Sequence, residues 1–151
     1  MIRRTIDSDH TALMALASAS GLFESEQIEL LAAMLKSPGE DDIWFTDEGD
    51  TGPVGVAYLA PEKMTHGTWN LYWIAVHPDQ QRQGRGQAIL NHIQQWLRGQ
   101  RVRILLVETA GTDDFDYVRQ FYAESGFEQE ARIRDFYDDG VDKVIFRKSL
   151  A

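Results

Sequence analysis

The chain has 151 residues and no cysteine, and its 24 acidic and 15 basic side chains give a formal net charge of −9. This length suits one domain with a sizeable core, so we expect residues 1–151 to form a single domain. The missing thiols exclude disulfides and cysteine nucleophiles, and the negative charge disfavours nucleic acid and anionic membranes as partners. The charge serves solubility or favours the approach of a cationic small molecule or a basic peptide.

No targeting or membrane-spanning segment is evident in the sequence. Met1-Ile2-Arg3-Arg4 leads directly into an ordinary strand and helix, and no apolar run reaches the roughly 20 residues that a membrane-spanning helix needs. The four histidines lack the spacing of metal ligands, so we expect no metal site. We therefore expect a cytoplasmic protein without a metal.

The first forty residues predict a strand and two amphipathic helices. Residues 2–6 alternate loosely, and Asp7 or Ser8 can cap a helix over 11–20. Ser25 can cap a second helix, which Ser37-Pro38-Gly39 ends. The inward positions that the spacing predicts are Leu13, Leu16 and Ala17 in the first helix, and Ile28, Leu30 or Leu31, Met34 and Leu35 in the second.

Three β-type runs follow the helices. Residues 43–46 and 54–60 are joined by the turn-rich segment 47–53, which predicts a hairpin. The aromatic run 69–76 predicts a third strand, and Pro78 ends it because proline has no N–H for the ladder. We expect three antiparallel strands at this point of the chain.

A glycine-bearing loop connects this third strand to the next helix. Residues 79–85 are polar, and the helix after them has apolar residues at spacings of three and four until Gly99. Gly84 and Gly86 can take backbone angles closed to other residues, so successive N–H groups can converge at the positive end of the helix. With Arg82 and Arg85 at its rim, the loop predicts a phosphate or pyrophosphate site.

The residues around Gly86 exclude two familiar phosphate sites. A nucleotide-binding P-loop needs Lys and then Ser or Thr after its last glycine, and this chain has Gln87 and Ala88. A dinucleotide fingerprint needs a third glycine where Ile89 stands. On the loop alone, a turn that uses glycine only for tightness remains an alternative.

The C-terminal third predicts a strand, a helix and a pair of strands. Residues 102–107 are almost continuously apolar, which indicates a central strand buried on both faces. A short helix over 115–122 ends with Gly126 as a left-handed cap. Residues 127–134 and 143–148 then predict a final pair of strands.

Two segments together carry a family resemblance. Gln81-x-x-Gly84-x-Gly86 resembles the acetyl-CoA loop of the GNAT N-acetyltransferase superfamily, and Phe121-Tyr122-x-x-x-Gly126-Phe127 resembles a second signature of that superfamily. The resemblance implies an α/β (α+β) fold of order β-α-α-β-β-β-α-β-α-β-β. Its mixed, mostly antiparallel twisted sheet would have six or seven strands, flanked by about four helices.

The resemblance implies acetyl transfer from acetyl-CoA to a primary amine by direct attack. Tyr122 would be the acid that protonates the departing thiolate, since an ordinary phenol is protonated at neutral pH. Glu108 ends the buried strand, where an open sheet has its crevice, and we expect it to be the general base. Deprotonation through water is the alternative, in which Glu108 only binds the substrate cation.

The same resemblance implies the cofactor contacts. Backbone N–H groups of the loop would hold the pyrophosphate, the loop arginines would lie near the 3′-phosphate, and backbone at Ile74 and Val76 would pair with the pantetheine arm. Phe115 stands where the family commonly has Asn, so contacts of that side chain are in question. The predicted cofactor-binding residues are Ile74, Val76, Gln81, Arg82, Gln83, Gly84, Arg85, Gly86, Gln87 and Phe115.

The acceptor is open between a small cationic amine and a peptide amine. Phe23 could line the acceptor side or belong to the core, and Asp135 and Tyr137 could bind an ammonium or belong only to a hairpin. The alternative function is a non-catalytic module of the same fold that binds acyl-CoA or a partner. Edge strands and aromatic residues such as Trp44 could support a homodimer.

Overall fold

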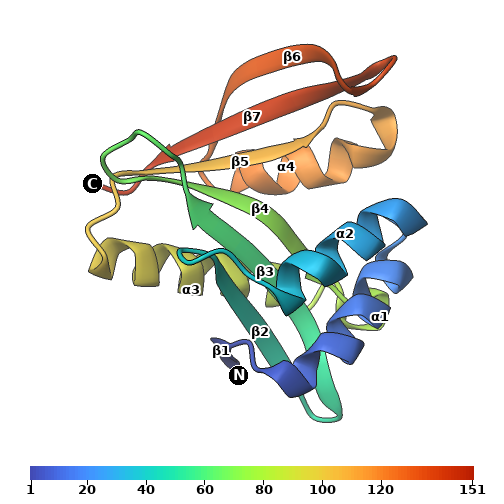
Figure 1. Cartoon of the computed structure of the whole chain (residues 1–151). Coiled ribbons are helices and arrows are strands. Elements are labelled where there is room, and N and C mark those ends of the chain that lie inside the picture. Colours follow the sequence, from blue (N-terminus) through green and yellow to red (C-terminus); the bar gives the residue numbers. More distant parts are fainter. The chain divides into compact units, whose positions relative to one another are not determined.

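The computed structural model describes all 151 residues of the chain and has seven strands and four α-helices (Figure 1). The strands are β1 (Ile2–Arg4), β2 (Ile43–Gly49), β3 (Gly52–Pro61), β4 (Thr68–Val76), β5 (Ile104–Ala110), β6 (Glu128–Asp138) and β7 (Val141–Ser149). The helices are α1 (His10–Ser20), α2 (Ser25–Lys36), α3 (Arg85–Gly99) and α4 (Asp116–Glu124). This confirms the predicted element order. None of the helices has the length and apolar character needed to cross a membrane.

The chain divides into two compact units. The first unit consists of Met1–Ala60 and Trp73–Trp96, and the second of Pro61–Tyr72 and Leu97–Ala151, so β4 and α3 each continue from one unit into the other. The strand order is β1-β2-β3-β4-β5-β7-β6. The β4–β5 pair is parallel, whereas the β1–β2, β2–β3, β5–β7 and β6–β7 pairs are antiparallel. The sheet is therefore mixed and mostly antiparallel, as predicted.

Helices α1 and α2 pack on one face of the strands of the first unit. Trp44 stacks on Tyr58 with ring centroids 4.5 Å apart and meets Trp73 edge-on at 6.0 Å. Leu31 packs against this cluster whereas Leu30 is 63% exposed, which decides between the two predicted positions. The buried residues of the cluster are Leu13, Leu16, Ala17, Leu35, Trp44, Val56, Tyr58, Ala60, Trp73 and Ala75.

Helix α3 packs on the opposite face of the first unit's strands. Because side chains alternate along a strand, Phe45 points away from its neighbour Trp44, and its ring meets those of His92 at 4.9 Å and Trp96 at 5.8 Å. A Cβ at Gly55 of β3 would stand 2.8 Å from Cδ1 of Ile89, so glycine there lets the helix approach closely. This packing fixes the direction in which the N-terminus of α3 points.

In the second unit, β7 lies between β5 and the edge strand β6, and α4 covers one face (Figure 1). The ring of Tyr122 on α4 lies 5.9 Å from that of Phe146, which pairs with Val107. Leu105 and Val107 are buried, but Leu106 is only half-buried. The prediction that this strand is buried on both faces is therefore wrong, because α4 covers only the face that carries Leu105 and Val107.

The last two strands form a longer hairpin than the sequence predicted. Asp139 and Gly140 alone make the turn, and Gly140 has a φ of +77°. Asp135 also has a positive φ, +54°, at an irregularity in the pairing of β6 with β7. Residues 135–138, predicted as a loop, therefore continue β6. Gly126 follows α4 with a φ of +89°, which confirms its predicted left-handed cap.

Candidate active site

The glycine loop of the first unit begins where β4 ends. The side-chain amide of Gln81 donates to the carbonyl of Val76 at 3.0 Å and so fastens the loop to the end of the strand. Arg82 has a φ of +61° and Gly84 a φ of +79°. A Cβ at Gly84 would meet no atom within 4 Å, so glycine is favoured there for its backbone angle and leaves open space beside the chain.

Gly86 differs from its prediction. It lies in the first turn of α3 and has no positive φ, so the expectation of an unusual backbone angle there is wrong, and Arg82 takes the second left-handed position of the loop. Ala88 is the first residue whose N–H bonds back, to the carbonyl of Gly84 at 3.0 Å. The N–H groups before it have no acceptor within the helix, and together with the helix dipole they favour an anion at this end.

The two loop arginines lie in different surroundings. Arg85 donates to the carboxylate of Asp47 on β2 at 2.9 Å, and the Asp47 side chain is only 5% exposed. Arg82 is exposed, as is Gln83. Arg85 is therefore held by a buried carboxylate rather than mobile at the rim, and Arg82 is the exposed cation of the loop.

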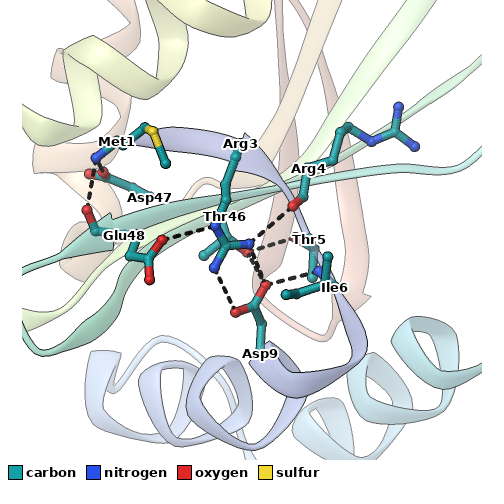
Figure 2. A network of polar contacts seen from close by, with 9 residues as sticks. All are labelled: Met1, Arg3, Arg4, Thr5, Ile6, Asp9, Thr46, Asp47 and Glu48. Atoms are coloured by element: carbon teal, nitrogen blue, oxygen red, sulfur yellow. Dashed lines mark hydrogen bonds and ion pairs between the residues drawn. The ribbon is translucent and has the colours of Figure 1, made fainter.

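Asp47 also belongs to a polar network that ties β1 to β2 and α1 (Figure 2). The Met1 ammonium lies 3.4 Å from Asp47, and Arg3 bonds both oxygens of Asp9 at 2.8 and 2.9 Å. Arg3 also donates to Glu48 at 3.0 Å. The hydrogen bonds from Arg3 lower the pKa of Asp9, although burial opposes them. The network therefore fixes β2, whose Asp47 accepts the hydrogen bond from Arg85.

The remaining residues predicted for the cofactor are scattered along the chain. Ile74 and Val76 on β4 are half-buried, and the carbonyl of Val76 already accepts the Gln81 amide. Gln87 is exposed on α3 and donates to Asn91 at 2.9 Å. Phe115 is half-buried in the turn before α4. Arg119, which the sequence reasoning missed, fastens this turn by donating to the carbonyl of Ala110 at the end of β5 at 2.6 Å.

Glu108 of the second unit is held by two donors. One oxygen forms an ion pair with Lys143 of β7, and the other accepts the side-chain amide of Asn70 at 2.7 Å. The side chains of Glu108 and Lys143 are 13% and 12% exposed. Pairing of β4 with β5 stops at Leu71 and Val107, immediately before Glu108. Each carboxylate oxygen has a second lone pair, so Glu108 can still accept a proton or another donor.

Tyr122 and Glu108 lie on opposite faces of the second unit's strands. Tyr122 contacts Phe146, which pairs with Val107, whereas Glu108 is the next residue of β5 and therefore points to the other face. Tyr122 is 3% exposed, and burial raises the pKa of its phenol. The phenol is thus protonated at neutral pH, as a proton donor must be.

The three residues predicted for the acceptor lie in different settings. Phe23 meets Trp73 edge-on at 5.4 Å and packs against the core cluster of the first unit. Asp135 accepts the N–H of Gly140 at 2.9 Å and so stabilises the hairpin. Tyr137 is 45% exposed, and its pKa is raised to about 12 by burial and by the charge of Glu108. The structure therefore brings Tyr137 into the electrostatic reach of Glu108.

A side chain next to Glu108 was missed by the sequence reasoning. Asn70 on β4 is 2% exposed, and its amide nitrogen donates to Glu62 at 2.9 Å as well as to Glu108. Tyr72 donates to the same oxygen of Glu62 at 3.1 Å. A polar Asn inside an aromatic strand was the available signal, but its partners are distant in sequence. No group of three or more His, Cys, Asp or Glu residues is arranged to hold a metal.

Comparisons with known proteins identify the family of this fold. The sequence profile of the acetyltransferase (GNAT) domain matches residues 39–129. A crystal structure described as a GNAT-family acetyltransferase from Desulfovibrio desulfuricans is 30% identical, with 100% of this chain and 99% of that chain covered and a TM-score of 0.93. The chain therefore belongs to the GNAT acetyltransferase family, which confirms the resemblance.

Other solved structures share the fold at lower identity. The ribosomal-protein-S18-alanine N-acetyltransferase from Escherichia coli is 23% identical. The match covers 100% of this chain and 94% of that chain, with a TM-score of 0.82. An acetyltransferase structure from Salmonella typhimurium, solved with its cofactor acetyl-CoA, is 14% identical, with coverage of 100% and 94% and a TM-score of 0.74. A comparison with curated protein sequences gives no match.

Proposed function

We propose that this acetyltransferase moves the acetyl group of acetyl-CoA to a primary amine by direct attack, with Glu108 as the general base and Tyr122 as the acid. The observation that carries the proposal is their placement on opposite faces of β5, next to the point where its pairing with β4 stops. A base on one face and an acid on the other suit a reaction in which the amine arrives and the thiolate departs on different sides. Family membership supports acetyl transfer. That the acceptor is a primary amine is part of the proposal.

The glycine loop fits the phosphates of acetyl-CoA. The left-handed Gly84, the open space beside it and the N-terminus of α3 would hold the pyrophosphate, and the exposed Arg82 would supply mobile charge. Arg85 would act mainly by fixing the start of α3 to β2 through Asp47. Acetyl-CoA supplies the acetyl group activated as a thioester. The related structure solved with acetyl-CoA supports this assignment.

The chain's own groups move the two protons. Glu108 takes one proton from the acceptor ammonium while Lys143 and Asn70 keep its carboxylate in place. The nitrogen–carbon bond forms, the carbon–sulfur bond breaks, and Tyr122 gives its phenol proton to the departing sulfur. The second proton of the attacking nitrogen leaves to solvent, and the Tyr122 phenolate regains a proton from solvent before the next turnover. Burial keeps the Tyr122 phenol protonated until that step. No covalent intermediate on the protein is needed, consistent with the absence of cysteine.

We further infer that residues 1–151 act as one acetyl-CoA-binding domain in the cytoplasm. The family profile draws its matched residues 39–129 from both compact units, which supports a shared function for them. A homodimer stays a prediction. Trp44, the aromatic residue that suggested it, is 5% exposed within the core of the first unit and is therefore a poor candidate for an interface.

Thermal melting with ligands tests the cofactor assignment. The protein is melted alone and with saturating acetyl-CoA, CoA or ATP. A ligand at about 100 times its dissociation constant stabilises the native state by roughly 2.7 kcal/mol, which raises the melting temperature by several degrees. We expect this shift with acetyl-CoA and CoA but not with ATP. No shift with any of the three would favour the non-catalytic module.

A further inference from the structure

A second carboxylate lies beside the proposed general base. Glu62, which directly follows β3, and Glu108 accept hydrogen bonds from the same nitrogen of Asn70, at 2.9 and 2.7 Å. One amide nitrogen therefore holds two carboxylates as close neighbours. All of these residues belong to the second unit.

The cluster has acceptors that the protein leaves without donors. Asn70 is only 2% exposed, and its Oδ1 is buried without a hydrogen-bond partner. One oxygen of Glu62 accepts from Asn70 and Tyr72, and the other has no donor. An unpaired buried acceptor costs about 1–3 kcal/mol, so a donor that arrives with a ligand would recover that free energy.

The charges in the cluster do not cancel. Lys143 pairs with Glu108, and its ammonium also lies 3.6 Å from the ring centroid of Phe136, so it is fixed at that carboxylate. No basic side chain forms an ion pair with Glu62. The cluster therefore has one negative charge in excess, and one cation would neutralise it.

Aromatic side chains border the two carboxylates. The hydroxyl of Tyr72 donates to Glu62, and burial together with the charge of Glu108 raises the pKa of Tyr137 to about 12. Both rings remain accessible, with Tyr72 44% and Tyr137 45% exposed. Exposed rings next to partly buried carboxylates suit a cation that carries an apolar group.

We propose that Glu62, Asn70 and Tyr72 form, with Glu108, a binding site for the primary ammonium of an acceptor that has an apolar or aromatic group next to its amine. The three hydrogens of the ammonium match the open oxygen of Glu62, Oδ1 of Asn70 and a second lone pair of Glu108. Glu62 holds the acceptor's charge while Glu108 takes one of its protons. This inference rests on the proposed function, since it places the acceptor at the same base.

Calorimetric titration without acetyl-CoA tests the site. The probes are 2-phenylethylamine, which is a cation at neutral pH, and the neutral 2-phenylethanol, with Glu62→Gln as the variant and Glu130→Gln on the exposed β6 as the matched control. We expect the wild type to bind the amine and not the alcohol. Glu62→Gln should weaken amine binding about tenfold through the lost charge, and Glu130→Gln should leave it unchanged. Equal amine binding by wild type and Glu62→Gln overturns the site.

A peptide pair tests whether the ammonium can come from a peptide amino terminus. One peptide has a free amino terminus and an apolar first residue, and the other is its N-acetylated form. Binding of the free peptide in preference to its blocked form supports the site, and binding of neither the peptide nor 2-phenylethylamine contradicts it. Thiol release from acetyl-CoA separates the two proposals. Amine binding that depends on Glu62 without thiol release contradicts the proposed transfer, whereas thiol release that is insensitive to Glu62→Gln contradicts only the ammonium site.

Discussion

The glycine loop of the first unit and the carboxylate cluster of the second unit are built from different parts of the chain. Backbone conformation makes the loop, through the positive φ of Gly84 and the N–H groups at the start of α3. Long-range side-chain contacts make the cluster, in which Glu108 bonds Asn70, 38 positions away. The loop should therefore be sensitive to backbone strain, and the cluster to the loss of single polar groups.

The largest effect should come from the acid of the second unit. Tyr122→Phe removes the phenol proton and keeps the ring among its aromatic neighbours, so we expect kcat to fall by about 100-fold or more with little change in stability. Tyr117→Phe, on the exposed side of the same helix, is the control. Steady-state thiol release measures both variants. Equal kcat values would remove Tyr122 from the mechanism.

The ion pairs of the second unit should differ in their contribution to stability. Lys143→Met leaves the nearly buried Glu108 without its cation and should lower the free energy of unfolding by about 3 kcal/mol. Arg132→Met breaks the more exposed pair with Asp142 and should cost less than about 1 kcal/mol. Urea unfolding compares the two variants. Similar losses would mean that Glu108 is far more hydrated than its 13% exposure indicates.

Backbone strain should affect the first unit's loop. Gly84→Ala and Gly99→Ala both add a Cβ that meets no atom within 4 Å, but only Gly84 has a positive φ. The left-handed conformation costs an alanine about 1–2 kcal/mol, so we expect Gly84→Ala to bind acetyl-CoA about tenfold more weakly and Gly99→Ala to bind it normally. Calorimetric titration with acetyl-CoA measures this difference. Unchanged affinity in Gly84→Ala would show that the loop does not need its left-handed residue.

A smaller, pH-dependent effect is expected at the network in Figure 2. The hydrogen bonds from Arg3 lower the pKa of Asp9 below its ordinary value of 3.8, so the folded protein binds fewer protons there than the unfolded chain. This stabilisation is present above about pH 4 and is lost as the pH falls through the lowered pKa. We expect Asp9→Asn to be destabilised at pH 6 and to lose less stability than the wild type on acidification, as measured by urea unfolding. A parallel pH dependence in both proteins would contradict the assignment.

The parts that the sequence predicted are those that neighbouring residues specify. Glycine positions and apolar spacing predicted the element order, the loop and the left-handed Gly126. Gly86 was misassigned because a glycine is equally compatible with a helix, and only the structure shows Arg82 in the second left-handed position. The pairing of Arg85 with Asp47 could not be predicted, since it depends on how α3 packs on β2.

The candidate site was predictable only in part for the same reason. Tyr122 lies in a short signature, and Glu108 directly follows an apolar run. The predicted strand end before Glu108 is wrong, since β5 continues to Ala110. Glu62 and Asn70 have no local pattern that connects them with Glu108, and their relation depends on the parallel register of β4 with β5. Lys143 reaches Glu108 through the antiparallel register of β7. The residues that we propose to bind the acceptor are therefore the ones that the sequence specifies least directly.

The most direct test of acetyl transfer to an amine is to follow acetyl-CoA and 2-phenylethylamine together, with thiol release and the acetylated amine measured in the same reaction. We predict that both products appear in equal amounts and that thiol release depends on the amine concentration. If thiol release stays at its amine-free rate with this amine and with a free amino-terminal peptide, the proposed transfer to a primary amine is wrong.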